Sequence, residues 1–162
     1  MASEEVKGIR AESVTAWYAE HVPTARPPLH FELIAGGHSN LTYCVTDAAG
    51  DRTVLRRPPL GAVLATAHDM SREHRIIAAL AATSVPVPPA LGLCEDETVN
   101  DAPFYVMDFV EGHVLDSAEV VRKHLPQAER PGLGDHVNAS VAHVPSAHRR
   151  APIRLRCHGR SS

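Results

Sequence analysis

A turn of small residues is the first feature of the sequence whose residue types could do chemistry. It consists of Gly36, Gly37, His38, Ser39 and Asn40, and it separates two stretches of extended character. Small residues let backbone N–H groups approach an anionic ligand such as a phosphate chain, and Ser39 or Asn40 can add a polar contact. A Gly-Gly pair between two strands is more often a simple hairpin turn. The turn predicts an anion-binding loop only in combination with other groups.

Two further groups carry charge where strand patterns end. Arg56 and Arg57 close the strand pattern that begins at Thr53, and neighbouring side chains on a strand point to opposite faces. At most one of the two arginines can therefore share a face with a given ligand, and we expect Arg57 to be a solvent-facing charge. The second group is the segment 108–112, Asp-Phe-Val-Glu-Gly, which follows an apolar strand pattern. It is compatible with a ligand-binding linker or with a turn after an edge strand.

Hydrophobic periodicity predicts the elements that must position these groups. Apolar residues at spacings of three and four indicate helices at 10–22 and 67–82. A capping residue, Asp116 or Ser117, and the following Pro126 indicate a third helix at 116–125. Alternating or apolar runs bounded by Gly and Pro indicate strands at 31–35, 41–46, 53–56, 90–94 and 104–107, with a polar loop at 95–101. The prediction is an α+β fold. It has a five-stranded, mostly antiparallel sheet, one long packed helix, an extra amino-terminal helix and an irregular carboxy-terminal tail.

The order of these elements and four of the segments resemble the aminoglycoside and choline phosphotransferase-like family. Within that family they look most like the branch related to the kinase-like domain fused to acyl-CoA dehydrogenases. The four segments are Phe31–Val45, Val54–Pro59, His68–Leu80 and Pro103–Gly112. The resemblance covers about residues 10–125, and it implies the amino-terminal lobe of a protein-kinase-like fold. We accordingly expect a nucleotide-binding lobe at 1–126, which runs into the hinge and the first linker helix.

The resemblance also implies an ATP site. The small-residue turn would cover the phosphates, Arg56 would replace the lysine that reaches the α- and β-phosphates, and Glu73 would be the glutamate that pairs with this cation. Main-chain groups near Asp108 and Val110 would bind adenine between apolar side chains. The implied nucleotide-binding set is Gly36, Gly37, His38, Ser39, Asn40, Val54, Arg56, Glu73, Met107, Asp108, Phe109 and Val110.

Phosphoryl transfer in this family requires an Asp in an H-G-D-x-x-x-x-N loop and a later Asp that binds Mg²⁺. In this sequence Gly134-Asp135 lacks the preceding His, and His158-Gly159 is followed by Arg160. We therefore assign no catalytic and no metal-binding residue, and we expect Mg²⁺ only in the complete enzyme. The chain alone is expected to be slow or inactive, and the acceptor, a small hydroxyl compound in the full-length parent, cannot be read from it.

The composition changes near residue 127. Residues 1–126 carry 10 Lys and Arg against 17 Asp and Glu, whereas residues 127–162 carry 6 against 2 and contain no aromatic residue. The acidic first part argues against a nucleic-acid partner. We interpret 127–162 as a poorly ordered, truncated or frameshifted remnant of a second lobe. An apolar lobe interface left exposed near the hinge would favour self-association.

Two other functions stay open beside the phosphotransferase. The chain could be a non-catalytic nucleotide-binding or interaction module that kept the lobe for a partner. A metal-binding protein is disfavoured, because the 11 His and 3 Cys residues show no ligand spacing. No apolar run is long enough to span a bilayer and the first ten residues do not resemble a signal peptide, so we expect a cytoplasmic protein without a membrane partner.

Overall fold

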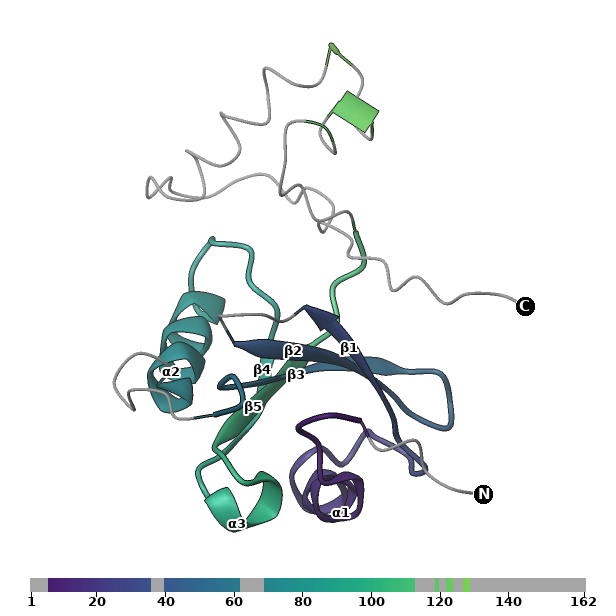
Figure 1. The fold of residues 1–162 in the computed structure, drawn as a ribbon. Helices are drawn as coiled ribbons and strands as arrows, with labels where there is room; N and C mark the ends of the chain where they lie inside the picture. The colour runs from purple at the N-terminus through teal and green to yellow at the C-terminus, as the bar shows by residue number, and fades with distance from the viewer. Residues whose placement is uncertain are drawn as a thin grey trace, which may run out of the picture. The chain divides into compact units, whose positions relative to one another are not determined.

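The computed structural model describes residues 6–35, 40–61 and 69–112, together with the single positions 119, 122, 123, 127 and 128. Figure 1 shows the elements in these ranges. In chain order they are α1 (Ala11–His21), β1 (His30–Ala35), β2 (Leu41–Thr46), β3 (Arg52–Arg57), α2 (Met70–Ala81), β4 (Ala90–Cys94), α3 (Glu97–Asn100) and β5 (Phe104–Asp108). The predicted helix at 116–125 and the tail at 127–162 lie almost entirely outside the described residues.

The chain divides into two compact units. One consists of residues 1–78 and 88–109, and the other of residues 79–87 and 110–162. The first unit holds the whole sheet, α1, α3 and the first part of α2. In the second unit, α2 ends where the Thr83 hydroxyl and backbone N–H both donate to the carbonyl oxygen of Leu80. The predicted boundary at residue 126 stays a prediction.

The five strands form one antiparallel sheet in the order β1-β2-β3-β5-β4. This confirms the predicted fold class. The strand limits at 41–46 and 90–94 match the predicted ones, because a Gly-Gly turn precedes the first segment and Pro88-Pro89 precede the second. In the register of the sheet, Tyr43 lies opposite Leu55, which lies opposite Val106.

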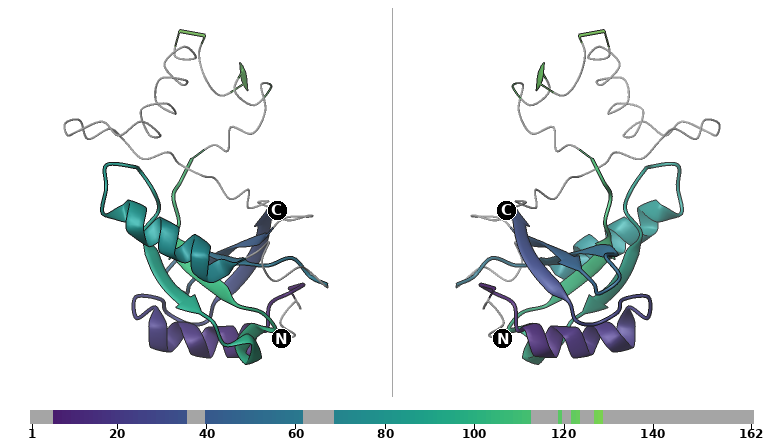
Figure 2. Two further views of the ribbon diagram at one scale, coloured as in Figure 1. Left: turned by 90° about the vertical axis from the view of Figure 1, so that its left-hand side faces the viewer. Right: turned by 90° about the vertical axis from the view of Figure 1, so that its right-hand side faces the viewer.

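The main hydrophobic core lies between α1 and one face of the sheet. Val14, Trp17 and Tyr18 recur at helical spacing and are buried against the strands. The strand side chains in this cluster include Phe31, Leu41, Tyr43, Val45, Leu55, Phe104 and Val106. The extra amino-terminal helix is therefore the element that closes the larger core. Figure 2 shows α1 along this side of the sheet.

A smaller group of side chains is buried on the opposite face of the sheet. Cys44, Val54 and Tyr105 are at most 2% exposed, as is Met70 in the first turn of α2. Strand alternation places Arg56 on the same face, because it is two residues from Val54 and pairs with Tyr105. The remaining apolar positions of α2 are only partly buried or exposed, so Met70 is the buried anchor of this helix.

The short helix α3 lies within the segment predicted as a polar loop, and the loop prediction was wrong at these residues. Asp96 caps the helix by accepting hydrogen bonds from the backbone N–H and the hydroxyl of Thr98, at 2.9 and 2.7 Å. The helix ends at Asp101, whose backbone is in the left-handed conformation with φ of 55°. A four-residue helix is too short for hydrophobic periodicity to reveal, whereas the Asp-x-Thr pattern of its cap is visible in the sequence.

Candidate functional site

An ion pair between β3 and α2 is the centre of the candidate site. Nη1 of Arg56 lies 3.5 Å from Oε2 of Glu73, and the two side chains are 31% and 32% exposed. Arg56 comes from the middle of the sheet, and Glu73 from the first turn of the helix that follows β3 in the chain. The structure thus brings together the cation and the carboxylate that the resemblance implied.

The Glu73 carboxylate has two further partners. Nδ2 of Asn40 donates to Oε1 at 2.7 Å, and the hydroxyl of Tyr105 donates to Oε2 at 3.1 Å. Asn40 was predicted as a contact of the nucleotide, whereas Tyr105 was not singled out. Strand alternation could have placed Tyr105 on the face of Met107, but only the register of β3 against β5 puts it opposite Arg56.

Burial raises the pKa of Tyr105 to about 12, with the Arg56 charge lowering it and the Glu73 charge raising it. The phenol is therefore protonated at neutral pH and acts as a hydrogen-bond donor to Glu73. Nε of Arg56 is buried and makes no hydrogen bond within the described residues. The guanidinium consequently uses only part of its donor capacity on protein groups.

The apolar part of the predicted site lies beside this ion pair. Val54 and Met107 are directly opposite each other in β3 and β5 and share the face of Arg56. Val54 is buried and Met107 partly buried. They are apolar neighbours of the guanidinium, and their role as walls of an adenine site stays a prediction.

Residues at the end of β5 make specific local contacts. The backbone N–H of Asp108 donates to the carbonyl oxygen of Pro89 at 2.8 Å, and its Oδ1 accepts from the N–H of Phe109 at 2.9 Å. The guanidinium of Arg52 lies 4.3 Å from the centre of the Phe109 ring. Phe109 is therefore held by a cation–π contact at the start of β3.

Five of the predicted nucleotide-binding residues are not among the contacts described above. Gly36, Gly37, His38 and Ser39 lie outside the described residues. Val110 belongs to the second compact unit. Their predicted roles toward a nucleotide stay predictions.

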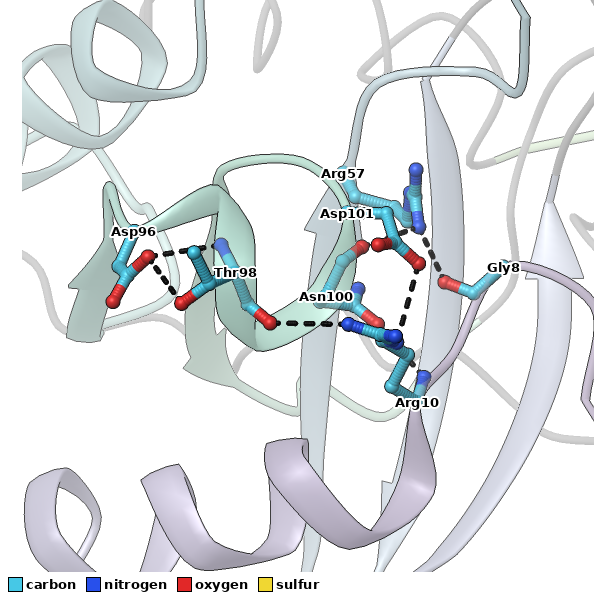
Figure 3. A network of polar contacts seen from close by, with 7 residues as sticks. All are labelled: Gly8, Arg10, Arg57, Asp96, Thr98, Asn100 and Asp101. Carbon is cyan, nitrogen blue, oxygen red and sulfur yellow. Dashed lines mark hydrogen bonds and ion pairs between the residues drawn. The ribbon is translucent and has the colours of Figure 1, made fainter.

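The prediction that Arg57 is solvent-facing was wrong, because its side chain is buried and only 4% of it is exposed. Figure 3 shows its guanidinium among carbonyl oxygens of two distant segments. Nη1 donates to the carbonyl oxygen of Gly8 and, at 3.0 Å, to that of Asn100. Alternation turns Arg57 to the α1 side of the sheet, where the segment before α1 and the helix α3 cover the end of the strand.

A separate cavity of about 330 Å³ lies on the α1 side of the sheet, with Tyr18, Asp47 and Thr53 in its wall. Of the predicted site residues its lining includes Asp108. Because Arg56 and Glu73 are on the other face, this cavity does not contribute to the ion-pair site.

Within residues 6–35, 40–61 and 69–112, no group of three or more His, Cys, Asp or Glu side chains could hold a metal ion. The helices in these ranges include none both long and apolar enough to cross a membrane.

Similarity to known proteins agrees with this geometry. The model of the family described as "Phosphotransferase enzyme family" matches residues 30–156. A crystal structure from Ralstonia eutropha JMP134, provisionally named an aminoglycoside phosphotransferase, has 36% sequence identity and a TM-score of 0.63. The match covers 82% of this chain and 36% of that one. The family match includes residues 127–156, which the sequence analysis interpreted as an aberrant remnant.

Two curated relatives are acyl-CoA dehydrogenase family members. Member 10 of Mus musculus is 46% identical over 76 residues, 47% of this chain and 7% of the relative. Member 11 of Homo sapiens is 38% identical over 98 residues, 60% of this chain and 12% of the relative. The chain thus spans only a small part of these relatives, and the similarity agrees with the branch inferred from the sequence. With its family match across residues 30–156 and a sheet of the expected kind, the chain belongs to the phosphotransferase enzyme family.

Proposed function

We propose that this chain is the nucleotide-binding part of an ATP-dependent phosphotransferase that acts on the hydroxyl of a small molecule. The observation that carries the proposal is the ion pair between Arg56 and Glu73 on the sheet face that also presents Val54 and Met107. Kinase-like enzymes use a cation at this point of the third strand to hold the phosphates, and a carboxylate from the long helix to orient the cation. The crystal structure named for an aminoglycoside phosphotransferase supports a small-molecule acceptor.

The residues of this face fit a purine nucleotide. The planar guanidinium of Arg56 presents a fork of donors that suits a phosphate, and the side chain is 31% exposed. Met107, which is partly buried beside the buried Val54, offers an apolar surface for a base. Glu73 contacts the Arg56 guanidinium at 3.5 Å, so it orients the cation from one side and does not surround it.

The residues of this chain would bind and orient ATP rather than transfer its phosphoryl group. ATP, bound with Mg²⁺, supplies the phosphoryl group in this chemistry. Arg56 would hold the phosphates, and main-chain groups of Asp108 would hold the base. The H-G-D loop that acts on the acceptor hydroxyl does not occur in the 162 residues. Turnover would therefore depend on groups outside this sequence.

Calorimetric titration with ATP and ADP, each with and without Mg²⁺, tests the proposal. Arg56→Ala is expected to weaken ATP binding about tenfold or more, because hydrogen bonds to charged groups are lost. Arg72→Ala is the control, because it also removes an arginine near the site. Arg72 precedes Glu73 in α2, and its side chain is exposed. If the unmodified chain binds no nucleotide, or if the two variants bind ATP equally well, the proposed function is wrong.

The second candidate is a non-catalytic nucleotide-binding module, which the missing H-G-D loop favours. Both candidates predict ATP binding, so turnover distinguishes them. The chain would be mixed with a separately produced carboxy-terminal lobe from a related phosphotransferase and with small hydroxyl compounds. Phosphorylated product that appears only in the mixture supports the phosphotransferase, whereas its absence under conditions where the lobes associate supports the module.

A further inference from the structure

Both oxygens of the Glu73 carboxylate accept hydrogen bonds from uncharged donors. The Asn40 amide occupies Oε1 at 2.7 Å, and the Tyr105 hydroxyl shares Oε2 at 3.1 Å with the more distant guanidinium of Arg56. The two donors come from different elements, since Asn40 immediately precedes β2 and Tyr105 lies in β5. The orientation of the carboxylate is therefore set from two sides by groups other than Arg56, and the Tyr105 hydroxyl also interacts with the Arg56 guanidinium.

The two donors are themselves held firmly. Tyr105 is fully buried and Asn40 is 6% exposed. The ring of Tyr105 also lies 6.2 Å from that of His74 in an edge arrangement, so its position is fixed by packing as well as by the hydroxyl. Groups buried in this way lose little further freedom when they hold a neighbour in one orientation.

The contact between Glu73 and Arg56 is weak for an arginine–carboxylate pair. Such pairs are frequently bidentate, with two N–H groups at about 2.7–2.9 Å. Here one nitrogen lies at 3.5 Å, and Nε makes no hydrogen bond within the described residues. A carboxylate released from Asn40 and Tyr105 could turn to face the guanidinium with both oxygens. That arrangement would occupy the donors that a phosphate needs.

We infer that Asn40 and Tyr105 are positioning residues for phosphate binding. They hold Glu73 so that it orients Arg56 through a single contact and leaves the remaining guanidinium donors to the phosphates of the nucleotide. The inference rests on the proposed function of this site. It gives Asn40 a role through Glu73, in place of the direct contact with the triphosphate that the sequence suggested, and it adds Tyr105 to the functional residues.

The matched variants are Tyr105→Phe and Tyr43→Phe. Each removes one hydroxyl from a buried tyrosine and keeps the ring. The hydroxyl of Tyr43 donates to the carbonyl oxygen of Lys7 at 2.7 Å on the α1 side of the sheet, away from Arg56. Asn40→Ala removes the second donor. Fluorescence of Trp17, the single tryptophan, verifies that each variant is folded.

Affinities for ATP, ADP and adenosine are measured by displacement of a fluorescent ATP analogue. Tyr105→Phe and Asn40→Ala are expected to weaken ATP and ADP binding about threefold to tenfold, which corresponds to the loss of one hydrogen bond. Adenosine binding should stay unchanged, because adenosine carries no phosphate. Tyr43→Phe should bind all three ligands as the unmodified chain does.

A double-variant comparison separates positioning from general structural support. If Tyr105 acts through Glu73, Tyr105→Phe should have no further effect on ATP binding in a Glu73→Ala background. An undiminished effect in that background, an equal loss of adenosine binding, or wild-type ATP affinity in both Tyr105→Phe and Asn40→Ala would overturn the inference. If Arg56→Ala weakens ATP binding while these variants do not, only the inference fails. A chain that binds no nucleotide at all overturns the proposed function with it.

Discussion

The guanidinium of Arg57 donates to the carbonyl oxygen of Gly8, forty-nine residues earlier in the chain, and this contact joins β3 to the segment that leads into α1 (Figure 3). The same guanidinium reaches the carbonyl oxygen of Asn100 at the end of α3. Arg10 extends the network, because its backbone N–H donates to Oδ1 of Asn100 at 2.8 Å and its Nε lies 3.3 Å from Asp101. One buried cation therefore holds the end of a strand, a loop and a short helix together.

Replacement of Arg57 by Met should destabilise the protein by about 3 kcal/mol. The change keeps an unbranched side chain of similar reach but leaves the carbonyl oxygens of Gly8 and Asn100 without their charged donor. Urea unfolding followed by Trp17 fluorescence measures the free energy of unfolding. Arg75→Met is the control, because Arg75 is exposed on α2 and contacts only the helix backbone in the described part of the chain. Equal stability of the two variants would contradict a structural role for Arg57.

Substitution of Gly92 by Ala should destabilise the protein by about 1–3 kcal/mol through overpacking. A Cβ atom at this position in β4 would lie 2.8 Å from Cη2 of Trp17, and the Trp17 ring is packed between His21 and Phe104. The clash is with a ring that has little room to move. Calorimetric melting of the variant and of the unmodified chain measures the loss of stability.

A second substitution identifies the cause of that loss. Trp17→Phe removes the part of the ring that a new Cβ would meet, so Gly92→Ala should cost less in the Trp17→Phe background than in the unmodified chain. An equal cost in both backgrounds would place the effect in the strand itself, at the irregularity between Ala90 and Gly92, rather than in the contact with Trp17.

Sequence patterns were sufficient for the five strands and the two long helices, and the family resemblance was sufficient for the ion pair. The strands at 41–46 and 90–94 are short, mostly apolar runs that follow a Gly-Gly turn and a Pro-Pro pair and precede polar residues, so local information fixes their limits. Arg56 and Glu73 were predicted as a pair because the resemblance supplied their partnership. Neither prediction required knowledge of the register between strands.

The features that sequence patterns missed depend on contacts between distant segments. Tyr105 is a site residue only because β5 pairs with β3 so that Tyr105 lies opposite Arg56. Arg57 is buried because two remote segments supply carbonyl oxygens to it, and nothing in its neighbourhood along the chain signals that covering. Strand alternation gives the face of a side chain, whereas burial depends on what the rest of the chain places there.

Asp47→Asn should lower the urea midpoint of unfolding, because Asp47 organises the turn between β2 and β3. Its carboxylate accepts from the backbone N–H groups of Arg26, Ala49 and Asp51 at 2.8–2.9 Å. An amide replaces one of the accepting oxygens by an NH₂ group, which cannot accept from any of these donors. Asp51→Asn is the control, since the side chain of Asp51 is exposed in the same turn.

The acid dependence of stability should differ between the unmodified chain and Asp47→Asn. Burial acts to raise the pKa of Asp47, but the backbone hydrogen bonds from Arg26, Asp51 and Ala49 lower it below the ordinary value of 3.8. The folded state therefore binds this proton less tightly than the unfolded state does, so the stabilising contribution is present above pH 3.8 and is lost as the pH falls through the lower folded pKa. The midpoint of the unmodified chain should accordingly fall more steeply below about pH 4 than that of the variant. If the urea midpoints of the two proteins fall equally with decreasing pH, this account is wrong.

The alkaline limit of stability should be set in part by the tyrosines. Burial raises the pKa of Tyr18 far above its ordinary value of 10.0, although the hydrogen bond with Thr53 acts in the opposite direction. Burial also raises the pKa of Tyr43 and Tyr105. Each group holds its proton more tightly when folded, so its contribution is fully present below the unfolded pKa and is lost as the pH rises toward the folded pKa.

The free energy of unfolding should therefore fall above about pH 10, where the unfolded chain releases tyrosine protons that the folded chain retains. In Tyr18→Phe the fall should be shallower, because one of the three tyrosines that drive it is gone. Urea unfolding at a series of alkaline pH values, followed by Trp17 fluorescence, measures both curves. The two proteins differ only in the Tyr18 hydroxyl, so the difference between the curves isolates this group. Curves of equal slope would mean that the Tyr18 hydroxyl is accessible to solvent in the folded protein, contrary to its burial between α1 and the sheet.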